Sequence, residues 1–398
     1  MYDLAVLWSW AEFAVRWLHV ITAIAWIGSS FYFIALDLGL NRDIDGPADG
    51  EEWQVHGGGF YHIQKYLVAP ENMPDHLTWF KWESYATWLS GFALLAIVYY
   101  LGADYYLIDP AIADLTRAQA ILISVASLGF GWLAYNQLCK WFVDYDQTML
   151  MIALFAVLVG MSYFYAQVFT GRAALLHLGA FTATIMSANV FAIIIPNQKI
   201  VVADLVAGRT PDAKYGKIAK QRSTHNNYLT LPVLFLMLSN HYPLAFASSA
   251  NWIIAALVFL MGVTIRHWFN TRHARGGHPY WTWGATVVLF LIIAWLSTAP
   301  MFRTAPAEIA RFSQADGFAE VHQIMVTRCV MCHAEEPAWP GLHWPPKGVV
   351  LQTEAQTTRH AYDIYLQAGV SHAMPPANVS YIEPAEREAI VAWYRAAR

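Results

Sequence analysis

The chain has 398 residues, of which 57% are hydrophobic and only 13% charged, a composition far from that of soluble proteins. The formal net charge is −4, and the basic residues are scattered or confined to short segments, so a nucleic-acid partner is excluded. Three cysteines are too few for a disulfide framework. These properties predict a protein embedded in the lipid bilayer.

Eight apolar runs are each long enough to cross the hydrocarbon core as a helix. We expect these spans near residues 11–36, 82–101, 119–138, 148–169, 173–195, 227–247, 250–268 and 280–300. No basic leader or cleavage site accompanies the first run, so we expect it to remain as a span. The predicted fold class is all-α, with an eight-span membrane bundle over residues 1–303.

Basic residues are concentrated in two of the connections. The connection after the fifth run carries Lys199, Arg209, Lys214, Lys217, Lys220 and Arg222, and the one after the seventh carries Arg266, Arg272 and Arg275. Lys and Arg are retained in the cytoplasm, so both connections are expected there. An even number of spans then places both termini on the opposite side.

Residues 37–80 form a long polar connection on the predicted cytoplasmic side. It contains the string H-G-G-G at His56–Gly59 and several aromatic residues, including Trp53 and Phe60. Connections of this length are usually functional lids or disordered, and the aromatic residues favour a lid.

Three histidines, His19, His177 and His241, are predicted at a similar level in the outer half of the spans. An ionisable residue inside a span is costly and indicates a function. The set would suit bis-histidine ligation of a haem b, with His19 paired to either of the other two. The alternative for each is a buried imidazole hydrogen-bonded to a carbonyl.

The inner ends of the sixth and seventh spans gather a second polar group. It consists of Arg222, His225, Asn226, Asn227 and Tyr228, followed by Arg266 and His267. An arginine would pair with an anion, the amides would read the edges of a planar molecule, and a histidine could exchange a proton. We therefore predict a site for a planar anion, with His225, Asn226, Asn227, Arg222 and His267 as catalytic residues. The alternative is an interfacial collar of polar residues.

From about Thr304 the composition becomes that of a soluble domain, predicted over residues 304–398. Helical patterns at 306–327 and 384–397 enclose a middle rich in Pro and Gly. Within it, C-V-M-C-H at Cys329–His333 has the spacing for covalent haem: Cys329 and Cys332 attach the porphyrin, and His333 binds the iron. This predicts a class I cytochrome c domain with haem c.

The sixth iron ligand is expected downstream of this motif. Met374 in A-M-P-P lies at a suitable distance, so His333 and Met374 are the predicted metal ligands. His372 and His360 are the rival ligands, and Met374 could instead be a packing residue.

Several strings resemble the membrane-bound cytochrome c urate oxidases. They are W-L-H-V-I-T-A-I-A-W-I-G-S-S-F-Y around His19, H-G-G-G-F-Y at His56, F-K-W-E-S-Y-A-T-W-L-S-G at Phe80–Gly91, I-M-S-A-N-V-F to P-N-Q-K, and H-N-N-Y-L-T-L-P-V-L-F-L-M-L-S-N-H-Y-P at His225. The first string is also similar to the haem-binding first span of membrane protoporphyrinogen oxidases and copper-resistance D proteins.

This resemblance implies oxidation of urate to 5-hydroxyisourate in purine breakdown, in the inner membrane of a bacterium with the cytochrome domain in the periplasm. Electrons would pass to haem c and then to a soluble cytochrome or a terminal oxidase. Two rival functions remain. One is a cytochrome anchored by a membrane domain that transports haem or a metal, and the other is an enzyme for another purine or a quinone.

Overall fold

The computed structural model of the chain describes residues 4–67, 74–109, 112–142, 147–298 and 306–397. The chain folds as two compact units, Met1–Ala299 and Pro300–Arg398. The domain boundary predicted at residues 303 and 304 lies outside the described residues.

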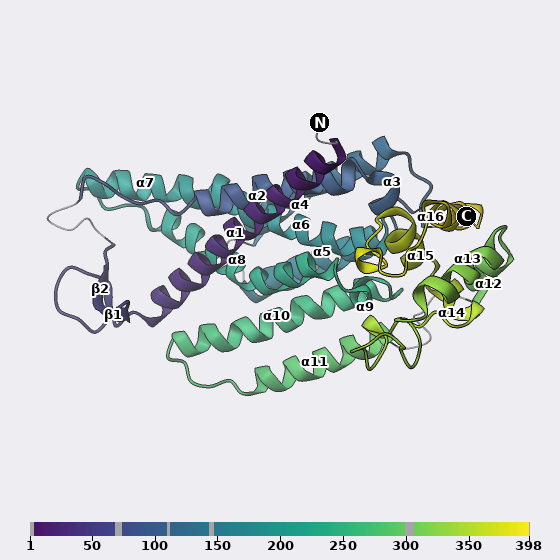
Figure 1. The fold of residues 1–398 in the computed structure, drawn as a ribbon. Helices are drawn as coiled ribbons and strands as arrows, with labels where there is room; N and C mark the ends of the chain where they lie inside the picture. Colours follow the sequence, from purple (N-terminus) through teal and green to yellow (C-terminus); the bar gives the residue numbers. More distant parts are fainter. Residues whose placement is uncertain (1–3, 68–73, 110–111, 143–146, 299–305, 398) are drawn as a thin grey trace. The chain divides into compact units, whose positions relative to one another are not determined.

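The N-terminal unit is a bundle of long helices with one β-hairpin (Figure 1). The hairpin and α7 lie at one end of the bundle, and α3 and α9 lie at the other. In chain order the elements are α1 (Leu4–Gly39), β1 (Gly50–His56), β2 (Gly59–Lys65), α2 (Trp82–Leu95), the π-helix η1 (Ala96–Tyr100), α3 (Ala103–Tyr106), α4 (Arg117–Trp141), α5 (Gln147–Ala166), α6 (Gly171–Ala188), the π-helix η2 (Asn189–Ile194), α7 (Ile195–Val206), α8 (Ala213–Ser239), α9 (Pro243–Phe246), α10 (Asn251–His273) and α11 (Trp281–Thr298).

Each of the eight predicted spans overlaps a long helix or a helix continued by a π-helical turn, and the sixth overlaps only in part. Within the described residues, six stretches are long and apolar enough to cross a membrane, and the chain is therefore a multi-pass membrane protein by length and composition. They are Leu7–Gly39, Arg117–Trp141, Gln147–Ala166, Gly171–Val206, Asn251–His273 and Trp281–Thr298. The two remaining helices, α2 and α8, pack inside the same bundle, α2 against α1 and α8 against α6 and α10. Eight spans stay a prediction.

The sixth predicted span differs most from the structure. Helix α8 begins at Ala213 and ends at Ser239, whereas the apolar run suggested 227–247. Pro232 lies inside α8, and a Cβ added to Gly262 of α10 would lie only 2.5 Å from its ring, so the glycine lets the two helices approach closely. Pro243 begins the separate helix α9, because a proline suits the first turn of a helix. The basic residues from Lys214 to Arg222 consequently lie on α8, not in a loop.

Hydrophobicity also failed to reveal the hairpin, which makes the membrane unit less purely helical than expected. Strand β1 pairs antiparallel with β2, with His56 opposite Gly59. The turn residues Gly57 and Gly58 have φ of 58° and 81°, a two-residue turn that glycine adopts without strain. Tyr32 of α1 donates a hydrogen bond to Gln54 Oε1 at 2.7 Å, and Asp37 of α1 pairs with both Lys65 of β2 and Lys220 of α8. The hairpin is thus attached to the end of the bundle.

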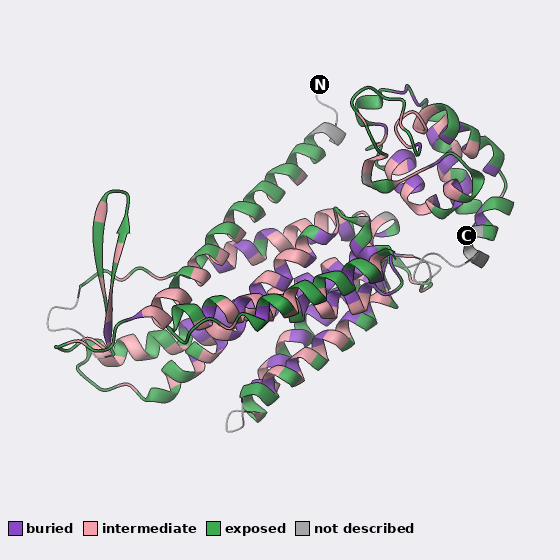
Figure 2. Cartoon of the chain, turned by 90° about the horizontal axis from the view of Figure 1, so that it is seen from below, coloured by how far each residue is buried: buried purple, intermediate pink, exposed green. Residues whose placement is uncertain are grey.

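The buried core lies where α4, α5, α6, α8 and α10 face one another (Figure 2). Among its fully buried side chains are Leu154, Phe181 and Leu236, and the free thiol of Cys139 is buried beside them, as expected of a small apolar residue. Helix α1 is by contrast largely exposed, with Trp10, Trp17 and Ile24 among its outward side chains. In a membrane these faces contact lipid.

The C-terminal unit is a small helical domain. Its elements are α12 (Pro306–Gln314), α13 (Phe318–Ile324), the π-helix η4 (Met325–Cys329), the 3₁₀-helix η5 (Pro346–Gly348), α14 (Glu354–Arg359), α15 (Ala361–Ile364), the π-helix η6 (Tyr365–Val370), the 3₁₀-helix η7 (Pro376–Asn378) and α16 (Pro384–Ala396). The single helix predicted over 306–327 is therefore broken before Gly317, which has a φ of 85°.

The C-terminal helix α16 organises this unit. It packs against α13 and η6. Its start is fixed by Pro384 in the first turn and by the side chain of Glu386, which accepts a hydrogen bond from the Glu383 N–H at 2.7 Å. The buried Trp393 donates its Nε1–H to the carbonyl of Phe312 at 2.9 Å. Helices before and after the C-V-M-C-H motif thus share one core.

Candidate functional site

A polar network is buried between α4, η2 and α8. The Tyr135 hydroxyl lies 2.8 Å from Nδ1 of His225, and Asn189 donates its amide N–H to the same hydroxyl at 3.2 Å. Asn189 also donates to Asn226 Oδ1 at 3.0 Å, and Asn226 donates to the Met186 carbonyl at 2.9 Å. Tyr135, Asn189, His225 and Asn226 are each at most 5% exposed. Helix packing therefore fixes the imidazole in a dry, polar setting.

Arg222 supplies the positive charge of this network. Its guanidinium donates to Asn189 Oδ1 at 3.2 Å and to Asn136 Oδ1 at 2.8 Å, and it lies 4.8 Å from the centre of the Tyr135 ring. The side chain is 3% exposed, and its Nε makes no hydrogen bond within the described residues. Residues 222, 225 and 226 share one face of α8 because they are three and four positions apart.

The structure places the other predicted site residues elsewhere. Asn227 lies on the adjoining face of α8, where its Oδ1 accepts from Arg266 of α10. His267 lies near Tyr228, with 3.5 Å between Nδ1 and the hydroxyl, and its ring centre is 5.9 Å from that of Trp281. The single polar group predicted at the inner ends of the sixth and seventh spans is thus divided into separate groups.

The Arg222 network has the parts needed to bind an anion and move a proton. Nε2 of His225 makes no hydrogen bond within the part of the chain that the structure describes. In the tautomer whose Nδ1–H donates to Tyr135, Nε2 keeps a lone pair that can accept a proton. The Nε–H of Arg222, which makes no hydrogen bond within the described residues, is a charged donor that an anion could use.

The family model described as "Urate oxidase N-terminal" matches residues 5–297, nearly the whole membrane unit. The chain belongs to the urate oxidase N-terminal family. Comparisons with curated proteins and with solved structures give no match. The resemblance expected from the sequence is confirmed for this domain, and an oxidoreductase related to the urate oxidases is indicated. The family match ends before the C-V-M-C-H motif, so the cytochrome c domain stays a prediction.

Three residues of this site in the urate oxidase domain were missed by sequence reasoning: Tyr135, Asn136 and Asn189. All three sit in apolar runs, where an amide or a buried phenol is itself a signal of function. Asn189 also begins the π-helix η2, and π-helical turns are frequent at functional sites. The π-helical turn could not be read from the sequence.

The three outer histidines are arranged differently from one another. His177 is fully buried, with Nδ1–H donating to the Ala173 carbonyl at 2.8 Å and Nε2 2.9 Å from the Ser124 hydroxyl. His241 is exposed just after α8. His19 donates Nδ1–H to the Thr87 carbonyl at 3.0 Å, and its ring packs against Gly91.

These contacts do not fit a bis-histidine haem b. Both ring nitrogens of His177 already have partners, which is the hydrogen-bonded imidazole weighed as the alternative. Only His19 combines partial burial with an Nε2 that the hydrogen bond to Thr87 leaves unused.

The C-terminal unit does fit a covalent haem. The backbone N–H groups of Cys332 and His333 donate to the Cys329 carbonyl at 3.1 and 2.9 Å, so one turn presents both free thiols and the imidazole. Nδ1–H of His333 donates to the Val349 carbonyl at 3.0 Å, which leaves Nε2 for iron. Burial lowers the pKa of His333, so that its imidazole is neutral near pH 7, the form that binds a metal.

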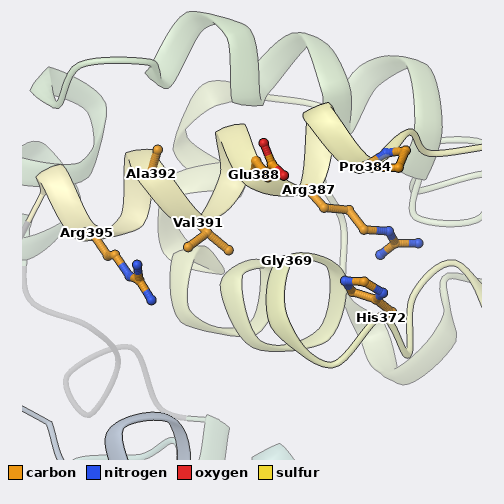
Figure 3. A pocket seen from close by; sticks show the side chains of 8 residues that line it. All are labelled: Gly369, His372, Pro384, Arg387, Glu388, Val391, Ala392 and Arg395. Carbon is orange, nitrogen blue, oxygen red and sulfur yellow. The ribbon is translucent and has the colours of Figure 1, made fainter. Parts of the chain in front are cut away.

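Met374 is held by main-chain contacts beside α16. Its N–H donates to the Gln367 carbonyl, and its own carbonyl accepts from Arg387 at 2.9 Å. The rival ligand His372 is exposed and faces a surface hollow of about 390 Å³ (Figure 3), and His360 lies 3.3 Å from Asp363. The hollow is lined by Gly369, His372, Pro384, Arg387, Glu388, Val391, Ala392 and Arg395. Met374 stays the predicted sixth ligand.

Proposed function

We propose that this chain oxidises urate to 5-hydroxyisourate and passes the electrons to a haem c bound by its C-terminal unit. The observation that carries the proposal is Arg222, a buried cation of the urate oxidase domain for which the described residues provide no carboxylate partner. The ion pairs among the described residues do not include it. A buried unpaired charge is costly, so a bound anion would complete this network. Urate carries one negative charge near neutral pH.

The chemistry needs a base and a route for electrons. Counted from the urate monoanion, oxidation to neutral 5-hydroxyisourate adds the oxygen of one water and releases one proton and two electrons. His225 is proposed to take one proton at Nε2, with Nδ1 held by Tyr135. Asn189 and Asn226 hold Tyr135 and each other in place, so that the base is positioned before urate binds.

Haem c would supply a one-electron acceptor, bound by Cys329, Cys332 and His333 with Met374 as the sixth ligand. The free thiols in one turn and the unused Nε2 of His333 support this assignment. A soluble cytochrome or a terminal oxidase would receive the electrons next, which is consistent with a methionine ligand and a high potential.

The proposed location is the inner membrane of a bacterium, with both termini and the C-terminal unit in the periplasm. The hairpin end of the bundle carries the exposed basic residues Arg209, Lys214, Lys217 and Arg272. Basic residues mark the cytoplasmic side, so α11, which ends at the opposite end of the bundle, leads the chain outward. Haem is attached to such motifs outside the cytoplasm. Eight spans are part of this proposal.

The test is the absorption spectrum of detergent-purified protein under argon before and after addition of urate. Reduction of the c-type bands by urate in the wild type and its loss in His225→Ala would support the proposal. His273→Ala is the matched control, because His273 is an exposed imidazole at the same end of the bundle. If dithionite reduces the bands but urate leaves them oxidised, urate oxidation is wrong, and an anchored cytochrome with a transporting membrane domain takes its place.

A further inference from the structure

A second buried arginine, which belongs to α10, packs against the neighbouring face of α8. Arg266 of α10 donates Nε–H and Nη2–H to Asn227 Oδ1 at 3.2 and 3.1 Å, and Nη2–H to Asn270 Oδ1 at 2.9 Å. Asn270 also donates to Asn227 Oδ1 at 3.0 Å. The guanidinium lies 4.2 Å from the centre of the Phe31 ring of α1. Three helices therefore surround this group.

No carboxylate among the described residues pairs with the charge of this group. Arg266 is 5% exposed, and the ion pairs of the described residues do not include it. Its partners are neutral amides and an aromatic ring, which lower the cost of the charge without cancelling it. An arginine kept only for packing would be replaced at lower cost by an apolar side chain, because the position lies within an apolar span.

An unused hydrogen-bond donor in the same group points to a ligand. Asn227 is fully buried, and while its Oδ1 accepts three hydrogen bonds, its Nδ2 makes none within the described residues. An unsatisfied buried amide is costly, so the position is explained best by an acceptor that is bound there during function. Such an acceptor beside Arg266 would be an anion with several oxygen or nitrogen atoms.

This group is separate from the Arg222 network. Asn226 bonds toward η2 and α6, while the next residue, Asn227, bonds toward α10. Successive residues of a helix point about 100° apart, so one helix wall divides the two groups. Within the described part of the chain no hydrogen bond joins them.

We propose that Arg266, Asn227, Asn270 and Phe31 form a second anion-binding site, which holds a planar purine monoanion of the urate class apart from the Arg222 network. The Nη1 of Arg266, which makes no hydrogen bond within the described residues, would donate to the delocalised charge, while Asn227 and Asn270 hold the other nitrogens of the guanidinium fork. The free Nδ2–H of Asn227 would donate to a ring nitrogen or a carbonyl, and Phe31 offers an apolar face. The inference rests on the proposed function for the identity of the ligand.

The test counts bound urate by equilibrium dialysis of the full-length protein in detergent, with radiolabelled urate under argon. Dithionite keeps every acceptor reduced, so that bound urate is not oxidised during the measurement. We expect two equivalents in the wild type and one each in Arg266→Gln and Arg222→Gln. Arg266→Lys keeps the charge but not the fork, and Phe31→Leu keeps the apolar volume but not the ring, so each should weaken only one of the two sites, by tenfold or more.

Each outcome bears on the second site. One equivalent in the wild type that Arg266→Gln leaves unchanged would overturn it while the proposed function stands. One equivalent that either arginine substitution abolishes would show a single composite site and would also overturn it. No binding of urate to the wild type would refute the proposed function itself. Unchanged melting temperatures of Arg266→Lys and Phe31→Leu would establish that their effects on binding do not come from unfolding.

Discussion

The hydroxyl of Tyr135 on α4 and the Nδ1 of His225 on α8 are 2.8 Å apart, in a site where neither side chain is more than 4% exposed. This contact fixes which nitrogen of the proposed base faces the ligand. Tyr135→Phe removes it and leaves a buried nitrogen without its partner, at a cost of about 1–3 kcal/mol. We expect urate to reduce the c-type bands at least tenfold more slowly, since about 1.4 kcal/mol corresponds to a factor of ten.

The matched control for that variant is Tyr165→Phe. Tyr165 is equally buried and lies 2.7 Å from the Ser127 hydroxyl, but it has no contact with His225. Tyr165→Phe should lower the melting temperature about as much as Tyr135→Phe does, and it should leave the rate at which urate reduces the c-type bands within a factor of about two of the wild-type rate. Equal rates in both variants, followed by stopped-flow absorption, would mean that the Tyr135 contact has no catalytic role.

Two glycines of α4 give a prediction about helix packing. A Cβ added to Gly131 would lie 2.3 Å from a ring carbon of Phe181 on α6, whereas one added to Gly129 meets nothing within 4 Å. Gly131→Ala should destabilise the bundle by about 1–3 kcal/mol through overpacking. Gly129→Ala should be neutral or stabilising, because alanine favours the helix. Thermal unfolding in detergent measures both, and equal melting temperatures would show that α4 and α6 can separate without cost.

The positions of the long helices were predictable because a span must be both apolar and about twenty residues long. The hairpin was missed although its signal was present. Trp53 and Val55 alternate with polar residues, and the pair Gly57–Gly58 that follows is typical of a tight hairpin turn. Hydropathy does not register such a segment, because neither of its faces is continuously apolar.

The candidate site was predicted in part. His225, Asn226 and Arg222 do belong to one network, since their spacing puts them on one helix face. Asn227 and His267 were grouped with them by nearness in sequence or expected depth, which does not fix the direction of a side chain. Tyr135 and Asn189 come from other helices, and only the packing of α4 and η2 against α8 brings them to His225.

The ion pairs of Asp37 attach the hairpin to the helix bundle, and this attachment can be tested. Its carboxylate pairs with Lys65 on β2 and with Lys220 on α8, at a distance of 2.8 Å for the latter. Asp37→Asn should release the hairpin and expose the bond after Lys65, so we expect trypsin to cut there several-fold faster, with less difference at high salt. Asp45→Asn, in an exposed part of the same connection, is the control. Cleavage of Asp37→Asn at the wild-type rate would contradict the attachment.

The three cysteines allow a direct test of the covalent haem. Cys329→Ala with Cys332→Ala removes both thiols of the predicted motif, and haem should no longer remain on the denatured polypeptide in a peroxidase-stained gel. Cys139→Ala is the control, because this buried thiol lies in the membrane unit and should leave the stain unchanged. Covalent haem that persists in the double variant would disprove the assignment of the motif.

The hydrogen bonds of Arg387 are expected to stabilise the segment that presents Met374. Its guanidinium is 7% exposed and donates to the carbonyls of Ala368 and Met374, so it joins α16 to the chain on either side of His372. Arg387→Gln would leave these carbonyls without their charged donor, which should destabilise the C-terminal unit by about 1–3 kcal/mol and change the axial-ligand absorption of haem c.

Arg395→Gln is the matched control, because Arg395 lines the same hollow from the same helix but is exposed (Figure 3). Thermal unfolding and the absorption spectrum of the oxidised protein are measured for both variants. A loss of stability shared by the two variants would mean that the charge of the hollow is the cause. A loss of stability and a spectral change confined to Arg387→Gln would identify the contact with Met374 as the cause.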